Sequence, residues 1–254
     1  MRSTESRVEF PILEKLTLQL YDPLPVHTTL FLGSLPALTD FTLQCSYVSI
    51  PSTLDFIWAQ LPGTRVCLQM FSRMTNAQLT SVHTVVSDLS LRCHDSEQRA
   101  MHTLLDALTA PCLKKFSITG SFFISRLIAF FDRSSCALTH LNIDHHNNTY
   151  DTDLLTLLGT PHACDIVDLG VSLRSLSMPR KLADALATRD IIPNLCTLAL
   201  KCSHGINGSV DSLLKIYAGR RPVLQSLWLS RASLSQDVEQ ALKSAGLEVV
   251  TFTY

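Results

Sequence analysis

Histidines and aspartates, the residue types most able to bind a metal ion or move a proton, are concentrated between residues 140 and 153 (HLNIDHHNNTYDTD). Imidazole nitrogens and carboxylate oxygens are typical ligands of zinc. On an extended strand, however, His145 and His146 point to opposite faces, so they cannot hold one ion together. His140 and Asp144 share a face but lie four residues, or about 13 Å, apart. The spacing also lacks the paired ligands that mark zinc sites. We therefore expect a solvated loop that holds no metal.

Catalytic motifs are missing from the sequence. It has no G-x-S-x-G, G-x-x-x-x-G-K-[ST], H-E-x-x-H or G-x-G-x-x-G segment, the signatures of a serine nucleophile, a phosphate-binding loop, a zinc protease and a dinucleotide site. A glycine-bearing turn at residues 204–208 (HGING) precedes an expected helix, whose N-terminus would favour an anion, but a plain loop explains it better. We expect a protein that is not an enzyme and takes no cofactor. A hydrolase with an unrecognised site is the disfavoured alternative.

The composition narrows the class of protein. Hydrophobic residues make up 46% and charged residues 17% of the 254 residues, which is typical of a folded chain. With 21 basic and 22 acidic residues, the net charge of −1 argues against a nucleic-acid surface. No apolar run is long enough to span a membrane, and no signal peptide is evident. Eight cysteines without a C-x-x-C pair are typical of free thiols in a reducing compartment. We expect a cytoplasmic or nuclear protein.

A short phrase, L-x-x-L-x-L, recurs along almost the whole chain. Its last apolar residues are Leu18, Leu43, Leu68, Leu91, Ile118, Ile143, Met178, Leu200, Leu229 and Phe252. The mean step of about 26 residues falls in the range of roughly 20–29 for leucine-rich repeats. The step from Ile143 to Met178 is longer, at 35 residues. Such a step suggests an insertion loop near a binding surface, but we favour an irregular repeat with an extra turn.

The periodicity assigns each phrase to a strand and the stretches between phrases to helices. In the second phrase, Phe41 and Leu43 face inward while Thr42 and Gln44 face outward, the period of a half-buried strand. Residues 96–109, 209–219 and 235–245 carry apolar residues at i, i+3, i+4 and i+7, one face of a helix. Neither face can be buried alone, so neighbouring units must stack.

These units predict an α/β fold, a leucine-rich-repeat solenoid shaped like a horseshoe. A concave parallel sheet of about ten strands would be covered by helices on the convex side. The solenoid is one domain over residues 10–254 after a tail at 1–9. Two groups are expected in its core. They are the cysteines that follow a phrase, Cys45, Cys93 and Cys202, and the phenylalanines Phe122, Phe123, Phe130 and Phe131.

The phrase, its period and the helical returns resemble ribonuclease-inhibitor-like leucine-rich repeats. More narrowly, irregular units such as APCLKKFSI and RPVLQSLWLS resemble the repeat region of fungal F-box proteins. In that family an N-terminal F-box docks on the Skp1 adaptor of a cullin ubiquitin ligase, and the repeats capture a substrate. Here a repeat strand already begins near Leu13 and no F-box helices precede it. The resemblance therefore implies a Skp1-like adaptor as partner only if an F-box exists outside this chain.

Side chains that point outward from the strands form the candidate binding surface. The mixed, mostly small residues there suit protein recognition better than phosphate or DNA. Trp228 is the one large aromatic residue among them, and Trp is enriched at interface hot spots. The alternative is that it packs beneath the chain end or a neighbouring long side chain. The same rows include Ser175 and Ser177 from the seventh phrase and Val249 and Thr251 from the last. The partner-binding candidates are Trp228, Arg92, Lys115, His140, Asn142, Asp144 and Lys201.

The sequence thus predicts a non-enzymatic scaffold that binds a protein partner on its concave face. Through the resemblance, this scaffold would be the substrate-recognition region of an F-box ubiquitin-ligase subunit. A stand-alone leucine-rich-repeat inhibitor or assembly scaffold is the alternative. Neither of these two functions requires nucleic acid, a membrane, a metal or a cofactor.

Overall fold

The computed structural model describes residues 13–20, 37–45, 64–70, 81–94, 98–145, 151–173, 180–202, 210–230, 236–244, 246 and 249–252. In these residues the fold is α/β, with one large parallel sheet of ten strands. The strands are β1 (Lys15–Leu20), β2 (Asp40–Cys45), β3 (Arg65–Met70), β5 (Asp88–Cys93), β7 (Lys115–Gly120), β8 (His140–His145), β9 (Asp168–Leu173), β10 (Thr197–Cys202), β11 (Ser226–Ser230) and β12 (Val249–Phe252). They lie side by side in the order of the sequence, so each is hydrogen-bonded to the strands before and after it.

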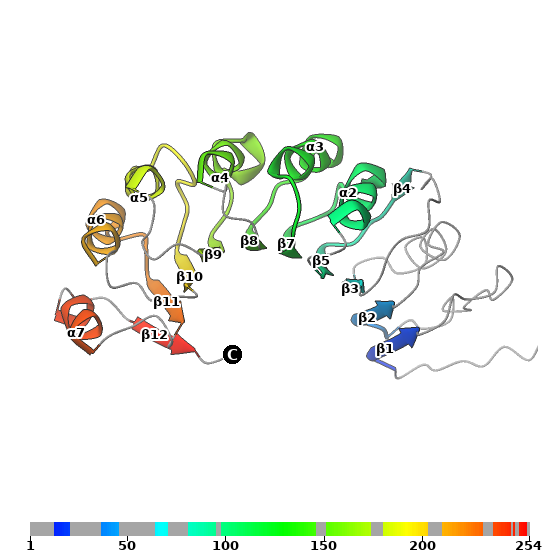
Figure 1. Ribbon diagram of the computed structural model, residues 1–254, viewed down its shortest axis with the longest axis horizontal. Helices are drawn as coiled ribbons and strands as arrows, with labels where there is room; N and C mark the ends of the chain where they lie inside the picture. Colours follow the sequence, from blue (N-terminus) through cyan, green and yellow to red (C-terminus); the bar gives the residue numbers. More distant parts are fainter. Residues whose placement is uncertain are drawn as a thin grey trace, which may run out of the picture.

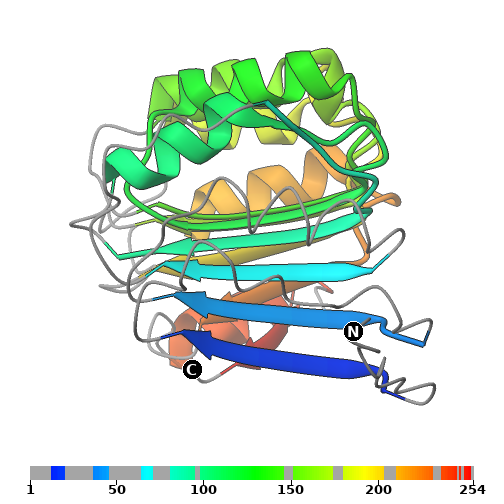
Figure 2. The ribbon, with the colours of Figure 1, turned by 90° about the vertical axis from the view of Figure 1, so that its right-hand side faces the viewer.

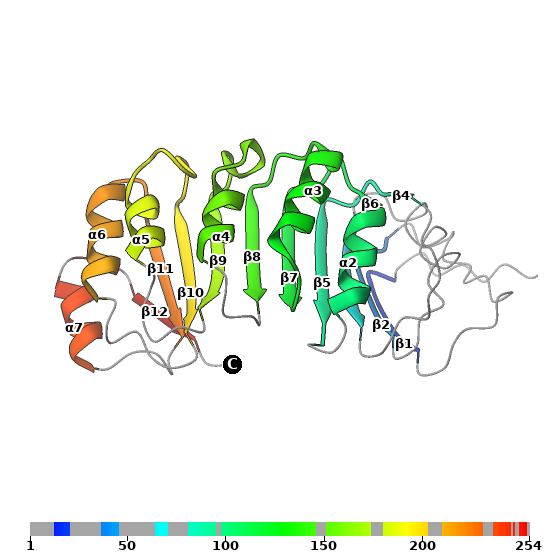
Figure 3. The same ribbon diagram turned by 45° about the horizontal axis from the view of Figure 1, so that its top comes forward.

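Helices form a second layer on one side of this sheet (Figures 2 and 3). The α-helices of the described residues are α2 (Gln98–Ala107), α3 (Ile124–Ser134), α4 (Asp151–Leu158), α5 (Arg180–Ala187), α6 (Val210–Arg220) and α7 (Gln236–Ser244), and a short 3-10 helix, η2 (Pro161–Ala163), follows α4. Two short strands, β4 (Val82–His83) and β6 (Leu108–Thr109), pair with each other in parallel.

The two layers bend into an arch, with the strands on the inner, concave side and the helices outside (Figure 1). The bend follows from the sizes of the elements. Neighbouring strands are about 4.8 Å apart, whereas packed helices need about 8–10 Å between axes. A one-to-one stack of strands and helices must therefore curve, with the narrower elements inside.

The apolar core lies between the layers and confirms the predicted alternation. Phe41 and Leu43 are buried while Thr42 and Gln44 are partly exposed. In the middle of the arch, the Phe116 ring on β7 lies 5.5 and 5.4 Å from the rings of Phe130 and Phe131 on α3.

One residue of the predicted core and one predicted helix boundary are wrong. Phe123 is 55% exposed, because it precedes α3 at Ile124 and does not belong to the buried face of the helix. Helix α2 ends at Ala107, and Leu108 is buried in β6 instead. Of the three cysteines placed in the core, Cys93 is 5% exposed. The side chains of the other two, Cys45 and Cys202, lie outside the described residues.

The seventh strand is not the predicted phrase LRSLSM but β9, which begins five residues earlier. Val171 pairs with Ile143 on one side and with Leu200 on the other. The predicted steps of 35 and 22 residues are thereby replaced by steps of 28 and 29 residues, and the insertion hypothesis is wrong. Asp168 and Gly170 occupy the positions given to Ser175 and Ser177, which lie outside the described residues.

The last strand also differs by one residue from the prediction. In the register of β11 and β12, Trp228 pairs with Val250 and Leu229 with Thr251. The prediction had placed Thr251 beside Trp228 and Val249 beside Ser226. The phrase LEVVTF has apolar residues at both alternating positions, so its pattern does not decide which set faces the core.

A buried arginine joins the helices α5 and α6. Arg220, at the end of α6, is 0% exposed. Its Nε donates to the carbonyl oxygen of Leu186 over 2.6 Å and its Nη2 to that of Ile191 over 2.5 Å, while Nη1 donates to that of Ile192. The neighbouring Gly219 permits this approach, because a Cβ there would lie 2.2 Å from the Ala187 carbonyl oxygen. The Leu186 carbonyl, left open at the end of α5, and two carbonyls of the segment that follows it thus gain donors from the next unit.

Candidate functional site

The strand register arranges the concave side chains in rows that cross the sheet. The first row is Lys15, Asp40, Arg65, Asp88, Lys115, His140, Asp168, Thr197 and Ser226. From Lys15 to Lys115 its charges alternate in sign. Arg65 Nε lies 3.8 Å from Asp88 Oδ2, and His140 Nε2 lies 2.7 Å from Asp168 Oδ2. Opposite charges on adjacent strands favour the observed register.

The side chains of the second row change in size along the arch. Its members are Thr17, Thr42, Cys67, Ser90, Ser117, Asn142, Gly170, Ala199 and Trp228. The first five are small. After Asn142 come two positions with almost no side chain, and then the indole of Trp228, which is 40% exposed. The sheet surface is therefore low over Gly170 and Ala199, with a larger side chain on each side.

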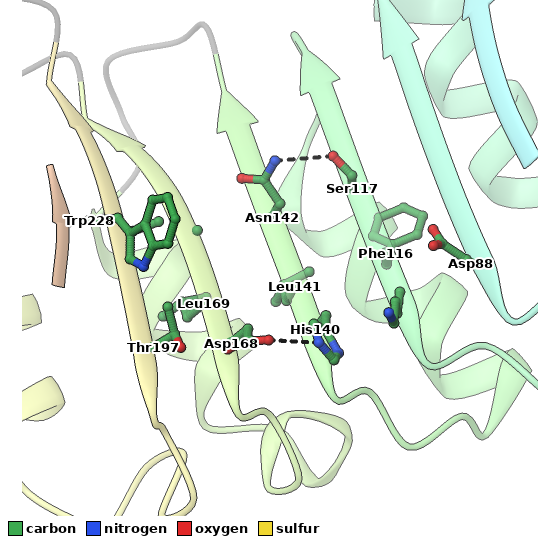
Figure 4. A pocket seen from close by; sticks show the side chains of 13 residues that line it. Asp88, Phe116, Ser117, His140, Leu141, Asn142, Asp168, Leu169, Thr197 and Trp228 are labelled. Carbon is green, nitrogen blue, oxygen red and sulfur yellow. Dashed lines mark hydrogen bonds and ion pairs between the residues drawn. The ribbon is translucent and has the colours of Figure 1, made fainter. Parts of the chain in front are cut away.

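This low region is a hollow of about 450 Å³, here called the Trp228 hollow (Figure 4). Its lining residues come from strands β5 and β7–β11. They are Asp88, Lys115, Phe116, Ser117, His140, Leu141, Asn142, Asp168, Leu169, Gly170, Thr197, Ala199 and Trp228. The buried Phe116, Leu141 and Leu169 show that the base of the hollow reaches the apolar core.

Gly170 is needed for space in the hollow. A Cβ atom at this position would lie 2.5 Å from Asn142 Oδ1, closer than atoms in contact allow. Asn142 Nδ2 donates to Ser117 Oγ over 3.2 Å, and this bond turns Oδ1 toward Gly170 and the hollow (Figure 4). Glycine on β9 thus keeps an amide oxygen available at the surface.

A histidine–aspartate pair lies at the edge of the hollow where the strands begin. The side chains of His140 and Asp168 are 38% and 39% exposed. His140 Nε2 contacts Asp168 Oδ2, while its Nδ1 lies 2.8 Å from Thr139 Oγ1. The imidazole is held at both nitrogens, and Asp168 keeps Oδ1 as a further acceptor because a carboxylate can accept at both oxygens.

An ion pair lies beyond the hollow where the strands end. Lys201 Nζ on β10 donates to Asp144 Oδ2 on β8 over 2.8 Å. Because Lys201 pairs in register with Ser172, its side chain crosses β9 to reach Asp144. The histidine–aspartate pair and the Lys201–Asp144 ion pair thus flank the floor formed by Gly170 and Ala199.

The structure brings most of the predicted binding residues together. Trp228, Lys115, His140 and Asn142 line the hollow. Asp144 and Lys201 form the ion pair beside it. Arg92 on β5 is exposed but is not among the lining residues.

Sequence reasoning missed Asp168, Gly170 and Ala199 as parts of one site. The first two were missed because the seventh phrase was placed too late in the chain. Even spacing of the repeats is the signal that identifies them, because it selects β9 over the phrase LRSLSM.

The histidine and aspartate stretch is divided between the two faces of β8, as strand alternation predicts. His145 is 5% exposed and lies on the core side. Its Nε2 donates to the carbonyl oxygen of Phe122 over 2.6 Å, and its ring meets the Phe122 ring edge-on at 4.7 Å. His146 lies outside the described residues. Within the described part of the chain, no three His, Cys, Asp or Glu residues are arranged to hold a metal ion.

No protein-family model, curated protein or solved structure matches this chain. In the part of the chain that the structure describes, no helix has the length and apolar character needed to cross a membrane.

Proposed function

We propose that the chain is a leucine-rich-repeat solenoid that binds a protein partner on its concave face. The repeat period supports the first part of the proposal. In the observed register the steps between equivalent residues run from 22 to 29 residues, within the range of roughly 20–29 for such repeats. Strand order by sequence and a helix layer on one side are what stacked strand–helix units produce.

The Trp228 hollow is the observation that carries the binding function. An exposed tryptophan beside a depression with polar and charged groups is the composition of an interface hot spot. The concave face has no one sign of charge, and its carboxylates disfavour a nucleic-acid backbone. Binding would be non-enzymatic: the arch holds a partner in a defined position.

The narrower form of the proposal makes this partner the substrate of a ubiquitin ligase. It rests on the resemblance of the repeat units to those of fungal F-box proteins. In this form a Skp1-like adaptor would join through an F-box outside this chain, while other subunits carry out the chemistry. The stand-alone inhibitor or assembly scaffold differs only in lacking that adaptor.

Affinity capture from cells that express the protein tests the binding face. Trp228→Ala is compared with Phe123→Ala, because Phe123 is an aromatic residue of similar exposure (55% against 40%) outside the hollow. We expect one or more proteins to be captured by the wild type and by Phe123→Ala but at least tenfold less by Trp228→Ala. Equal capture by all three proteins would contradict the proposed face. When the tag is placed on the full-length product of the native transcript, a Skp1-like adaptor among the captured proteins supports the ligase form, and its absence with the partner still present supports the alternative.

A further inference from the structure

We infer that the Trp228 hollow receives an arginine side chain of the protein partner. This inference rests on the proposed function and names the chemistry by which the concave face recognises its ligand. It follows from three features of the hollow: the hydrogen-bond acceptors, the exposed indole and the balance of charges.

The polar groups nearest the floor present acceptors to a ligand. Asn142 uses its Nδ2 to donate to Ser117 Oγ, which leaves Oδ1 facing the hollow over Gly170 (Figure 4). Asp168 uses Oδ2 for His140, which leaves Oδ1 as an acceptor. A ligand group that donates hydrogen bonds is therefore matched by these two oxygens. The guanidinium of arginine has five N–H donors in one plane and no acceptor.

The exposed indole favours a flat cation. Trp228 stands beside Ala199 in the register, with Gly170 one strand further. Because these two residues have almost no side chain, a ligand can reach the floor beside the indole. Guanidinium groups stack on indole rings through cation–π and dispersion contacts. The ammonium of lysine makes the electrostatic contact without the planar stacking, so arginine is preferred to lysine.

The charges of the hollow favour a cation as well. The hollow is lined by two carboxylates, Asp88 and Asp168, and one ammonium, Lys115. Its net charge is therefore negative when His140 is neutral. Lys115 lies two strands from Asp168, with His140 between them in the first row, so Asp168 and not Lys115 is the charged group on the strand of Gly170. An acidic ligand side chain beside Gly170 would face the Asp168 carboxylate and the Asn142 oxygen, which repel it. Charge complementarity therefore selects a basic segment of the partner.

Capped amino acids measure this preference without an identified partner. The indole N–H signal of Trp228 is followed by ¹H–¹⁵N NMR at pH 7.5 during titration with N-acetyl-arginine amide. The chain has two tryptophans, and Trp228→Phe identifies the signal by removing it. N-acetyl-citrulline amide is the neutral isostere and N-acetyl-glutamate amide is the acidic control.

We expect a saturable shift with the arginine probe and a dissociation constant at least fivefold higher for the citrulline probe. Asp168→Asn should weaken arginine binding at least threefold and leave citrulline binding unchanged. Ala199→Leu, which fills the floor, should weaken both probes, whereas Arg92→Ala, outside the hollow, should weaken neither. Thermal unfolding of each variant confirms that it is folded. No saturable shift with arginine, or equal binding of arginine and citrulline, would overturn the inference.

The titration and the affinity capture together distinguish a failure of this inference from a failure of the proposed function. If partner capture depends on Trp228 but the arginine probe does not bind the hollow, the inference is wrong and the binding face stands. If capture is unaffected by Trp228→Ala and the probe does not bind either, both are wrong.

Discussion

Lys201 on β10 reaches across β9 to form a 2.8 Å ion pair with Asp144 on β8. The two residues are 57 positions apart in the sequence and two strands apart in the sheet. The pair covers Ser172, which is 9% exposed between them. One interaction therefore links three consecutive repeats at the edge of the proposed binding site.

The Lys201–Asp144 pair should make a small contribution to stability. The side chains are 36% and 21% exposed, and pairs near the surface are worth about 0–1 kcal/mol. A double-mutant cycle with Lys201→Met and Asp144→Asn, followed by urea unfolding, should give a coupling free energy of roughly 0.5–1 kcal/mol. The more exposed Arg126–Asp106 pair, at 50% and 41%, is the control and should give less. Equal coupling free energies in both cycles would show that the Lys201–Asp144 pair is no more stabilising than a more exposed surface pair.

Arg220→Met should destabilise the fold strongly. The substitution keeps much of the apolar volume but leaves the carbonyl oxygens of Leu186, Ile191 and Ile192 without their donor. Hydrogen bonds from charged groups contribute about 1.5–3 kcal/mol each, and removing the buried charge offsets part of that sum. We expect a loss of about 3 kcal/mol in the free energy of unfolding. Arg126→Met, on an exposed helix face, should cost under about 1 kcal/mol. A loss of that small size for Arg220→Met would refute the assigned role.

His102 should make stability depend on pH. Its Nε2 accepts the backbone N–H of Phe123 over 3.1 Å, and its ring stacks on Phe123 at 4.6 Å. Burial, and then the nearby Arg126, hold the pKa of His102 below its ordinary value near 6.5. The unfolded chain therefore binds the proton first, so this contribution is present above about pH 6.5 and is lost as pH falls through the folded pKa.

Urea unfolding at pH 7.5 and pH 5.0 measures this dependence. The wild type should lose more stability on acidification than His102→Gln, whose amide oxygen accepts the same N–H without titrating. Identical losses in the two proteins would show that His102 does not titrate in this way.

Cys136 should be the least reactive thiol of the described cysteines. It is 2% exposed, and burial raises its pKa from an ordinary 9.0 to about 11. A rise of two units leaves roughly 100-fold less thiolate, the reactive form, at neutral pH. In a short pulse of iodoacetamide followed by mass spectrometry, the exposed Cys112 and Cys164 should be modified first. Cys136 should react only after unfolding in urea. Early modification of Cys136 in the native protein would contradict its placement in the core.

The strands of the fold were predictable because their pattern repeats. Nine of the ten strands coincide with a predicted phrase, and β9 is the exception. The segment 166–171 (IVDLGV) and the segment 173–178 (LRSLSM) both fit the apolar pattern. A pattern of apolar residues cannot choose between them, but near-equal spacing of the strands can, because only β9 keeps the steps at 28 and 29 residues.

The site was predictable only in part. The outward direction of Trp228 follows from strand alternation. The hollow could not be predicted in this way. It depends on the very small side chains of Gly170 and Ala199, and Gly170 lies on β9, the strand that was placed wrongly. From the sequence alone, Arg220 is indistinguishable from an ordinary basic residue at a helix end. That it is buried depends on how closely α6 approaches the end of α5, which is a tertiary property.

Site-directed photo-crosslinking in cells tests the central claim, binding of a protein at the Trp228 hollow, most directly. The photoreactive residue p-benzoylphenylalanine is placed at position 197, which lines the hollow and leaves Trp228 intact, in one protein and at position 123, the exposed aromatic site outside the hollow, in another. Our account predicts a discrete crosslinked protein from position 197 that is absent from position 123. It also predicts that Trp228→Ala reduces the crosslink from position 197. Crosslinks from position 123 with none from position 197 would contradict the account.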